Sequence, residues 1–126
     1  MPDLKGVSVL VVDDHADARE LTGQMLETRG ARVQVAGSVA EALEAVSLGS
    51  FDVLVSDIGM PGADGYELLK RLRERGCDLP AIALTAFARS EERSKVLRAG
   101  FRVHLAKPVE PIELCAAVAD AAGRTA

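Results

Sequence analysis

The sequence has little cysteine and no long hydrophobic run. Its two cysteines, Cys77 and Cys115, lie far apart and belong to no Cys-x-x-Cys or Cys/His pattern, which argues against a disulfide framework and against the usual zinc sites. We expect both to be reduced thiols in a cytoplasmic protein. No apolar stretch approaches the roughly 18 residues of a membrane-spanning helix. The N-terminus also lacks the basic and then apolar pattern of a secretory signal.

An excess of positive charge is missing as well. The net charge is −4 at pH 7, whereas nucleic-acid binding relies on clustered Lys and Arg. One basic group occurs, but Glu91 and Glu92 interrupt it, and a solvated helix face explains it more simply. Its members are Arg89, Arg93, Lys95 and Arg98. We therefore expect no nucleic-acid surface and no insertion into a membrane.

What the chain does have is a regular alternation of strand-like and helix-like segments. Its 126 residues, 48% of them hydrophobic, are enough for one domain with a core, and we expect a single domain over residues 1–126. Apolar runs predict strands over residues 7–12, 32–36, 52–56, 81–85 and 102–106. The first and third are nearly continuous in Val and Leu, which is typical of strands covered on both faces.

Helices are predicted between and after these strands by apolar spacing and by start and stop signals. Ser38 and Glu41 form a capping box that starts the second helix, and Pro111 fits the first position of the fifth. Gly30, Gly76 and Gly100 end the first, third and fourth helices. The apolar faces are expected at Ala18, Leu21, Met25 and Leu26; at Val39, Ala42, Leu43 and Val46; at Leu68, Leu69 and Leu72; at Val96 and Leu97; and at Leu114, Val118 and Ala121. Five such units predict an α/β fold, a single doubly wound parallel sheet with right-handed crossovers.

Acidic residues stand where two of the buried strands end. Asp57 follows the run 51–56, and Asp13-Asp14 follow the run 7–12. With the strand order 2-1-3-4-5, the first and third strands are neighbours, and ligands bind beyond their carboxyl ends. The three carboxylates should therefore meet in one cleft. Thr85, at the end of the fourth strand, and Lys107, just past the fifth, should reach the same edge.

Such a cluster needs a counter-charge, because like charges a few ångströms apart resist joint ionisation. Hard carboxylate oxygens suit Mg²⁺, with Mn²⁺ as an alternative. We expect Asp14 and Asp57 to bind the ion directly, Asp13 to act through water, and a backbone carbonyl near Gly59 to complete the ligands. Taken alone, Asp13-Asp14 could equally be a helix N-cap.

Several motifs together resemble the receiver domains of two-component response regulators. They are Val-Val-Asp13-Asp14, Asp57-Ile-Gly-Met60-Pro61-Gly-Ala-Asp-Gly65, Leu84-Thr85-Ala86 and Lys107-Pro108. The resemblance covers nearly the whole chain and implies the flavodoxin-like fold, from which the strand order above is partly taken. It also implies a signalling phosphoacceptor rather than an enzyme.

The resemblance implies a role for each site residue. Asp57 would attack a phosphoryl group carried by a histidine kinase or a histidine phosphotransfer protein, giving an aspartyl phosphate. Mg²⁺ and Lys107 would neutralise the charge on oxygens of the phosphoryl group, and Thr85 would donate a hydrogen bond to another of these oxygens. Phosphoryl transfer depends mainly on such positioning and charge neutralisation. The alternatives are a solvated Lys107 and a Thr85 that is only a strand residue.

Further expectations concern the loops and the switch. Pro108 is expected to follow a cis peptide bond, and Gly62 and Gly65 fit either a turn near the pocket or ordinary loops. Family members couple the threonine to an aromatic residue on the fifth strand, where this chain has His104, so His104 is either a switch residue or a half-exposed strand histidine. Gly59 and Phe87 occupy the positions that tune the lifetime of the phosphorylated state, with opposed tendencies.

The sequence fits two other functions less well. Phosphatases of the haloacid dehalogenase type carry an Asp-x-Asp pattern on the first strand, which here ends Asp13-Asp14-His15. A receiver-like module that no longer uses phosphate would lack one of the five site residues. The stretches around Thr85 and Lys107 favour the receiver of a hybrid sensor kinase, with a stand-alone regulator as the alternative. Docking or phosphorylation-linked dimerisation is expected through the fourth helix, fifth strand and fifth helix.

Overall fold

The computed structural model describes residues 3–60, 64–86 and 90–123, in ten elements that alternate strand and helix. The strands are β1 (Ser8–Val12), β2 (Arg32–Ala36), β3 (Val53–Asp57), β4 (Ala81–Thr85) and β5 (Val103–Ala106). The helices are α1 (Ala16–Glu27), α2 (Val39–Leu48), α3 (Gly65–Glu74), α4 (Ser90–Ala99) and α5 (Pro111–Ala121). All strand pairs are parallel, in the order β2-β1-β3-β4-β5. The predicted fold is confirmed, with strand boundaries within one residue of those expected.

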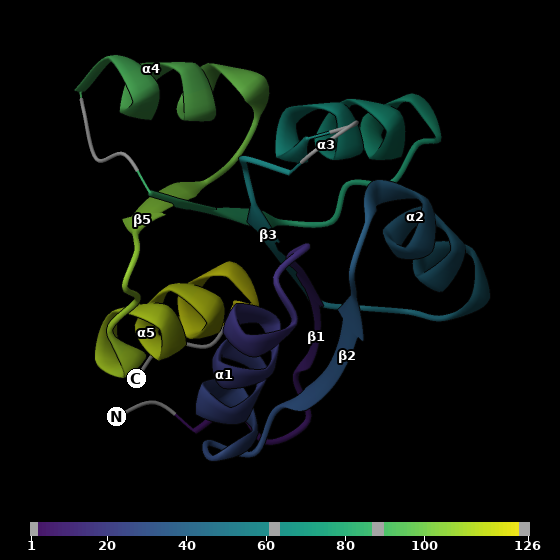
Figure 1. Cartoon of the computed structure of the whole chain (residues 1–126). Helices are drawn as coiled ribbons and strands as arrows, with labels where there is room; N and C mark the ends of the chain where they lie inside the picture. The colour runs from purple at the N-terminus through teal and green to yellow at the C-terminus, as the bar shows by residue number, and fades with distance from the viewer. Residues whose placement is uncertain (1–2, 61–63, 87–89, 124–126) are drawn as a thin grey trace.

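Helices cover both faces of the sheet. In Figure 1, α1 and α5 lie together on one side of it, and α2, α3 and α4 lie on the other. Successive residues of a strand point to opposite faces, so Leu10 and Val12 join one core cluster while Val9 and Val11 join the other. The central strands are therefore buried on both faces, as their unbroken apolar sequence predicts. Among the described helices, none is long and apolar enough to span a bilayer.

Side-chain caps fix where two of the helices start. The Ser38 hydroxyl accepts a hydrogen bond of 3.1 Å from the Glu41 amide, which is one half of the predicted capping box. The Glu41 carboxylate accepts a bond of 3.3 Å from the Gly37 amide and not from that of Ser38. The Asp64 carboxylate caps α3 as Ser38 caps α2, accepting a hydrogen bond of 3.0 Å from the Glu67 amide. Each of these two caps satisfies one of the amides that the first turn of a helix leaves free. The cap at Asp64 matters for the site, because it holds the start of α3 beside the end of β3.

One predicted helix face differs from the structure. Leu21 was expected on the buried side of α1, but it is 55% exposed. Thr22 and Gly23 are buried against the sheet in its place. A Cβ added at Gly23 would lie 3.4 Å from the Val33 side chain, so the small residues allow α1 to approach β2 closely. Apolar spacing alone favours leucine over threonine and glycine, and it therefore selected the wrong side of this turn.

The contact between α3 and α4 depends on an aromatic side chain with polar partners. The Tyr66 hydroxyl donates a 2.8 Å hydrogen bond to Glu92, and the Lys95 amine lies 4.7 Å from the centre of the Tyr66 ring. Phe101 meets the same ring edge to face, with the ring centres 6.3 Å apart. Among the described side chains of α4, Val96 is the buried one. Predicted to be buried with it, Leu97 is 43% exposed.

We predict that Gly65→Ala destabilises the protein. A Cβ at this position would lie 2.7 Å from the carbonyl oxygen of Asp57 and 3.1 Å from Ile58, so α3 would have to move away from β3. Overpacking of this kind costs about 1–3 kcal/mol. Gly59→Ala is the matched control, since no described atom lies within 4 Å of its Cβ, and a change within about 0.5 kcal/mol is expected. Urea unfolding of both variants measures the difference, and equal stabilities would contradict the packing argument.

Candidate functional site

The register of β1 and β3 brings the acidic residues together. Val12 pairs with Ser56 across these parallel strands, so Asp13 and Asp57 occupy equivalent positions at the same sheet edge. Both residues are buried: Asp13 is 1% exposed and Asp57 is 5% exposed. Asp14 follows in the loop that leads to α1 and is partly buried. The convergence predicted from strand order is therefore present.

Lys107 completes the charge arrangement from the end of β5. Its Nζ lies 3.0 Å from Asp13 Oδ2 and 3.4 Å from Asp57 Oδ1, so one ammonium bridges the two buried carboxylates. Its backbone amide donates a hydrogen bond of 2.8 Å to the carbonyl of Thr85 at the end of β4. The peptide bond between Lys107 and Pro108 is cis, as the resemblance implied. Lys107 is thus part of the site and not a solvated surface lysine.

Two residues that the sequence reasoning did not assign also touch the acidic group. The His15 amide donates a 2.9 Å hydrogen bond to Asp13 Oδ1, and the Arg19 guanidinium donates one of 2.9 Å to the Asp13 carbonyl. His15 directly follows the aspartate pair, and Arg19 lies about one helical turn further along α1. Their positions next to Asp13-Asp14 were the available signal. Both hold Asp13 in place from the α1 side.

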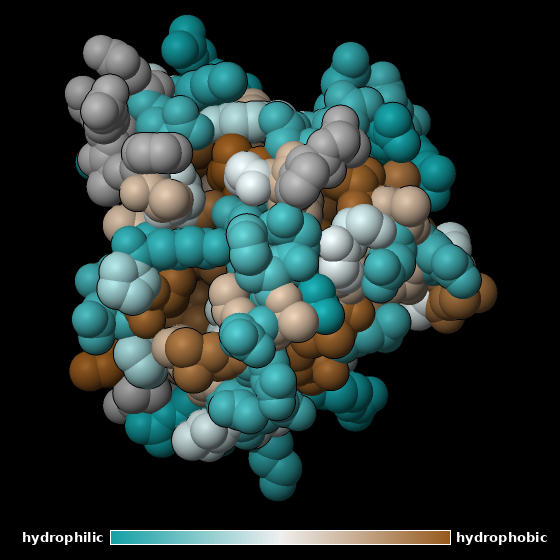
Figure 2. Space-filling view, in the orientation of Figure 1, coloured by the Kyte–Doolittle hydropathy of each residue, from teal (hydrophilic) through white to brown (hydrophobic). Residues whose placement is uncertain are grey.

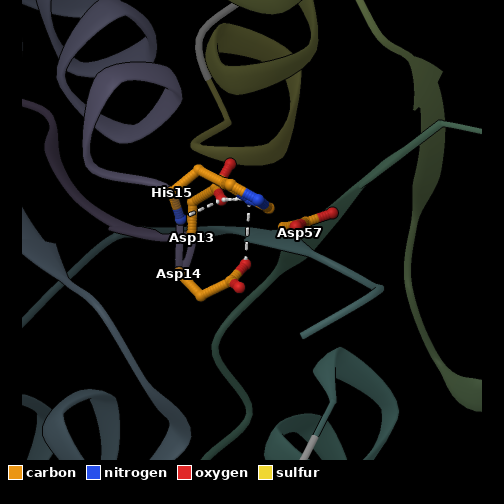
Figure 3. A group of neighbouring side chains, drawn as sticks. All are labelled: Asp13, Asp14, His15 and Asp57. Carbon is orange, nitrogen blue, oxygen red and sulfur yellow. Dashed lines mark hydrogen bonds and ion pairs between the residues drawn. The ribbon is translucent and has the colours of Figure 1, made fainter. Parts of the chain in front are cut away.

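The side chains of the acidic residues and His15 place a compact set of possible metal-ligand atoms, called the donor set below, in the pocket. Figure 3 shows the side chains of Asp13, Asp14, His15 and Asp57 converging, and one ligand atom from each lies within 4.8 Å of the others. Within the described part of the chain, Asp14 Oδ1 is the buried side-chain atom that no hydrogen bond satisfies. Buried polar atoms are normally paired. The donor set and this oxygen fit a divalent cation.

Burial and charge oppose each other at Asp57. Burial raises the pKa of the Asp57 carboxyl, and the nearby Asp13 carboxylate raises it further, whereas Lys107 lowers it and does not offset the rise. At Lys107, burial alone would lower the pKa, but the hydrogen bond with Asp13 and the charge of Asp57 raise it overall. Lys107 therefore stays charged, and Asp57 is a carboxylate whose ionised form is disfavoured without a further cation.

The remaining predicted residues have mixed positions. Thr85 is buried at the end of β4, one residue beyond the Leu84 that pairs with Asp57. His104 is half-buried on β5, opposite Ala83. The backbone of Gly59 donates a hydrogen bond to Asp57, while the assignment of its carbonyl as a metal ligand stays a prediction. The expectations for Gly62 and Phe87 fall outside the described residues.

Comparisons with known proteins agree with this geometry. Residues 9–119 match the model of the response regulator receiver domain. The chain is 50% identical over 116 residues to an uncharacterised 14.6 kDa protein of Leptolyngbya boryana, covering 90% of this chain and 88% of that protein. It is 39% identical over 101 residues to the sensor histidine kinase RcsC of Salmonella typhimurium, covering 80% of this chain but 11% of the kinase. The chain thus spans only about a tenth of that kinase.

Solved structures give the same result. The receiver domain of the Francisella response regulator 1452 superimposes with a TM-score of 0.89 at 33% identity, covering 96% of this chain and 100% of that one. Chemotaxis protein CheY4 of Vibrio cholerae gives a TM-score of 0.85 at 29% identity, covering 91% of this chain and 98% of that one. Neither the phosphatase alternative nor a module without phosphate chemistry is supported. The chain belongs to the response regulator receiver domains, the phosphoacceptor domains of two-component signalling.

Proposed function

We propose that Asp57 accepts the phosphoryl group, with Mg²⁺ bound directly by Asp14, Asp57 and the Gly59 carbonyl and held by Asp13 through water. The observation that carries this is Lys107 Nζ within 3.4 Å of both Asp13 and Asp57. The buried Asp57 carboxylate therefore lies beside the positive charge of Lys107, at the open edge of the sheet. Mn²⁺ is the alternative cation, because the same oxygen ligands suit both ions.

Each residue then has one task in the transfer. The Asp57 carboxylate attacks the phosphorus atom of a phosphohistidine donor, a P–O bond forms as the P–N bond breaks, and the donor imidazole leaves with the electron pair. Lys107 neutralises charge on the phosphoryl oxygens, and the Thr85 hydroxyl donates to another of them. A bound divalent cation supplies the remaining charge neutralisation. His104, three residues before Lys107, is the candidate partner of Thr85 in switching.

The donor is inferred to be a histidine kinase or a histidine phosphotransfer protein. Two relatives carry names of sensor proteins with much longer chains, RcsC and EvgS, which supports the hybrid-kinase origin, whereas the 14.6 kDa relative is close to this chain in size. The hybrid origin and the single-domain assignment of residues 1–126 stay proposals. A cytoplasmic location is proposed too, supported by the free thiols of Cys77 and Cys115.

The docking surface is proposed to be formed by α4, β5 and α5. Figure 2 shows hydrophobic surface between β5 and α5 with hydrophilic residues around it. On α5, Ile112 is 66% exposed. Basic Arg93 and Arg98 are exposed on α4, whereas the amine of Lys95 lies over the Tyr66 ring of α3. The surface thus combines an apolar area with the positive charge of Arg93 and Arg98. Such a combination fits a protein partner or a second copy of the chain.

Phosphorylation at Asp57 can be tested by labelling with a small phosphodonor and Mg²⁺. We expect the wild-type chain to take up label, Asp57→Asn to take up none, and Lys107→Ala to be labelled roughly 10²–10³ times more slowly, because one charged donor to the phosphoryl oxygens is lost. Asp52→Asn is the matched control. Asp52 lies just before the start of β3, at the other end of the strand, where it accepts a hydrogen bond from the Ser8 amide. Label retained in Asp57→Asn would refute the assignment.

Asp57→Asn should also stabilise the cation-free protein. Because the pKa of Asp57 is raised in the folded state, its ionised form lowers the free energy of unfolding once the pH exceeds the unfolded value of about 3.9. The advantage of the variant should therefore grow as the pH rises from that value through the folded pKa, and then stay constant. Urea unfolding in EDTA at several pH values measures it. If the variant is less stable than wild type at pH 7, the attraction of Lys107 for the Asp57 carboxylate outweighs the cost of burying its charge.

Mg²⁺ should stabilise the wild-type protein by mass action. A cation present at 100 times its Kd adds about 2.7 kcal/mol to the free energy of unfolding. Asp14→Ala removes a ligand and should lose most of this gain. The comparison of thermal unfolding in Mg²⁺ and in EDTA checks it, with Asp17→Ala, on the exposed first turn of α1, as the charge-matched control.

Phosphorylation-linked dimerisation can be tested by gel filtration. With beryllofluoride and Mg²⁺ as a stable substitute for the phosphoryl group, we expect a shift from monomer to dimer. Ile112→Glu should abolish the shift, because it places a charge in the apolar area, without altering labelling of Asp57. An unchanged elution volume for the wild-type chain would argue against self-association through this surface.

A further inference from the structure

His15 is the one member of the donor set that the proposed function does not use. Its Nδ1 lies 3.2 Å from Asp14 Oδ1 and 3.5 Å from Asp13 Oδ1. In Figure 3 the ring reaches over the two aspartates towards Asp57. The side chain is 71% exposed, so it lies at the solvent side of the acidic pocket and not in the core.

Neither helix capping nor core packing gives a reason for histidine at this position. His15 is the N-cap of α1, where Ser, Thr, Asp or Asn normally accept a hydrogen bond from the first turn. Its side chain makes no such bond. Its backbone is in the ordinary extended region, at φ −92° and ψ 113°, which places no demand on the side chain. The imidazole neither caps the helix nor packs in the core, and its ring nitrogen is directed instead at the carboxylates.

The spacing of the donor atoms matches that of ligands around one ion. Metal–ligand bonds of about 2.0–2.2 Å place adjacent ligands roughly 3 Å apart and opposite ligands about 4.2 Å apart. The Nδ1 of His15 is 3.2 Å and 3.5 Å from oxygens of Asp14 and Asp13, and all four donors lie within 4.8 Å. The two nitrogen–oxygen distances are thus close to those between adjacent ligands of one ion. Asp14 Oδ1, the ligand atom 3.2 Å from His15 Nδ1, accepts no hydrogen bond from the described residues.

A nitrogen ligand changes which ion the site prefers. Mg²⁺ takes oxygen ligands, whereas imidazole suits first-row transition ions, whose affinities rise from Mn²⁺ through Co²⁺ towards Cu²⁺. We propose that His15 Nδ1 is a ligand of the divalent cation and shifts this receiver towards Mn²⁺ and Co²⁺ over Mg²⁺. This inference rests on the proposed function, because it requires a cation at Asp13, Asp14 and Asp57.

Calorimetric titration of the cation-free protein with Mn²⁺, Co²⁺ and Mg²⁺ tests the proposal, at about pH 8 where histidine is ordinarily neutral. We expect His15→Ala to lower the Mn²⁺ and Co²⁺ affinities by about tenfold or more, the scale on which changes near metal sites act. The Mg²⁺ affinity should change much less. Asp17→Ala, a neighbouring change on the exposed first turn of α1, should leave the ratio of Co²⁺ to Mg²⁺ affinity unchanged.

A second variant separates coordination from folding. His15→Asn offers an oxygen in place of the nitrogen and is a favoured N-cap residue, so it should fold at least as stably as wild type. It should keep the Mg²⁺ affinity and lose the preference for Co²⁺. If His15→Ala and His15→Asn both leave the ratio as in wild type, or change all affinities by one factor, His15 is at most a counter-charge and the proposal is wrong.

Imidazole NMR gives a readout that does not depend on affinity. The chain has two histidines, so ¹⁵N spectra resolve His15 and His104 separately. On addition of Zn²⁺ as a diamagnetic probe, we expect the Nδ1 resonance of His15 to move to the coordinated position while that of His104 does not. A His15 resonance that stays in place overturns the proposal.

The outcomes also distinguish this inference from the function on which it rests. If Mg²⁺ supports labelling of Asp57 while His15→Ala leaves cation selectivity unchanged, the role of His15 fails and the phosphoacceptor site stands. If none of the cations binds, both fail. If Co²⁺ selectivity depends on His15 but Asp57→Asn is still labelled, the metal site stands and the phosphoacceptor assignment fails.

Discussion

The parallel register of β1 and β3 is the constraint on which this site depends. Because Val12 pairs with Ser56, Asp13 and Asp57 must emerge side by side, and burial prevents water from separating their charges. Mutual repulsion at this point would oppose folding. The structure offsets it with Lys107, which reaches both carboxylates from β5 and ties the end of the sheet to them. A second cation is then favoured at the open side of the pocket.

Much of this could be predicted from the sequence because it follows from repeated local rules. Unbroken Val and Leu runs defined β1 and β3, and the Ser38–Glu41 capping box placed the start of α2 correctly. Strand order then brought Asp13, Asp57 and Lys107 to one edge. The strands and helices follow from periodicity, which the sequence shows directly, whereas the strand order is taken partly from the resemblance to receiver domains.

The features that sequence reasoning missed depend on packing and on direction. Leu21 faces solvent because Thr22 and Gly23 let α1 approach the sheet. Apolar patterns predict that a leucine is buried more readily than a glycine, so they cannot indicate this arrangement. The contacts of His15 and Arg19 with Asp13 depend on where the first turn of α1 directs its side chains. Asp64 caps α3, but it lies within the 57–65 motif that was interpreted only as part of the family resemblance.

The contacts that hold α4 to the domain affect how easily this helix opens. Its described side chains bury only Val96, and its link to α3 passes through Tyr66, Glu92 and Lys95 at the edge of the fold. Polar and cation–π contacts of this kind give less free energy than the apolar packing beneath α1 and α5. Local opening should therefore begin at α4 while the rest of the sheet stays closed. We therefore expect α4, which follows Thr85 in the chain, to rearrange at a smaller cost in free energy than unfolding of the whole domain.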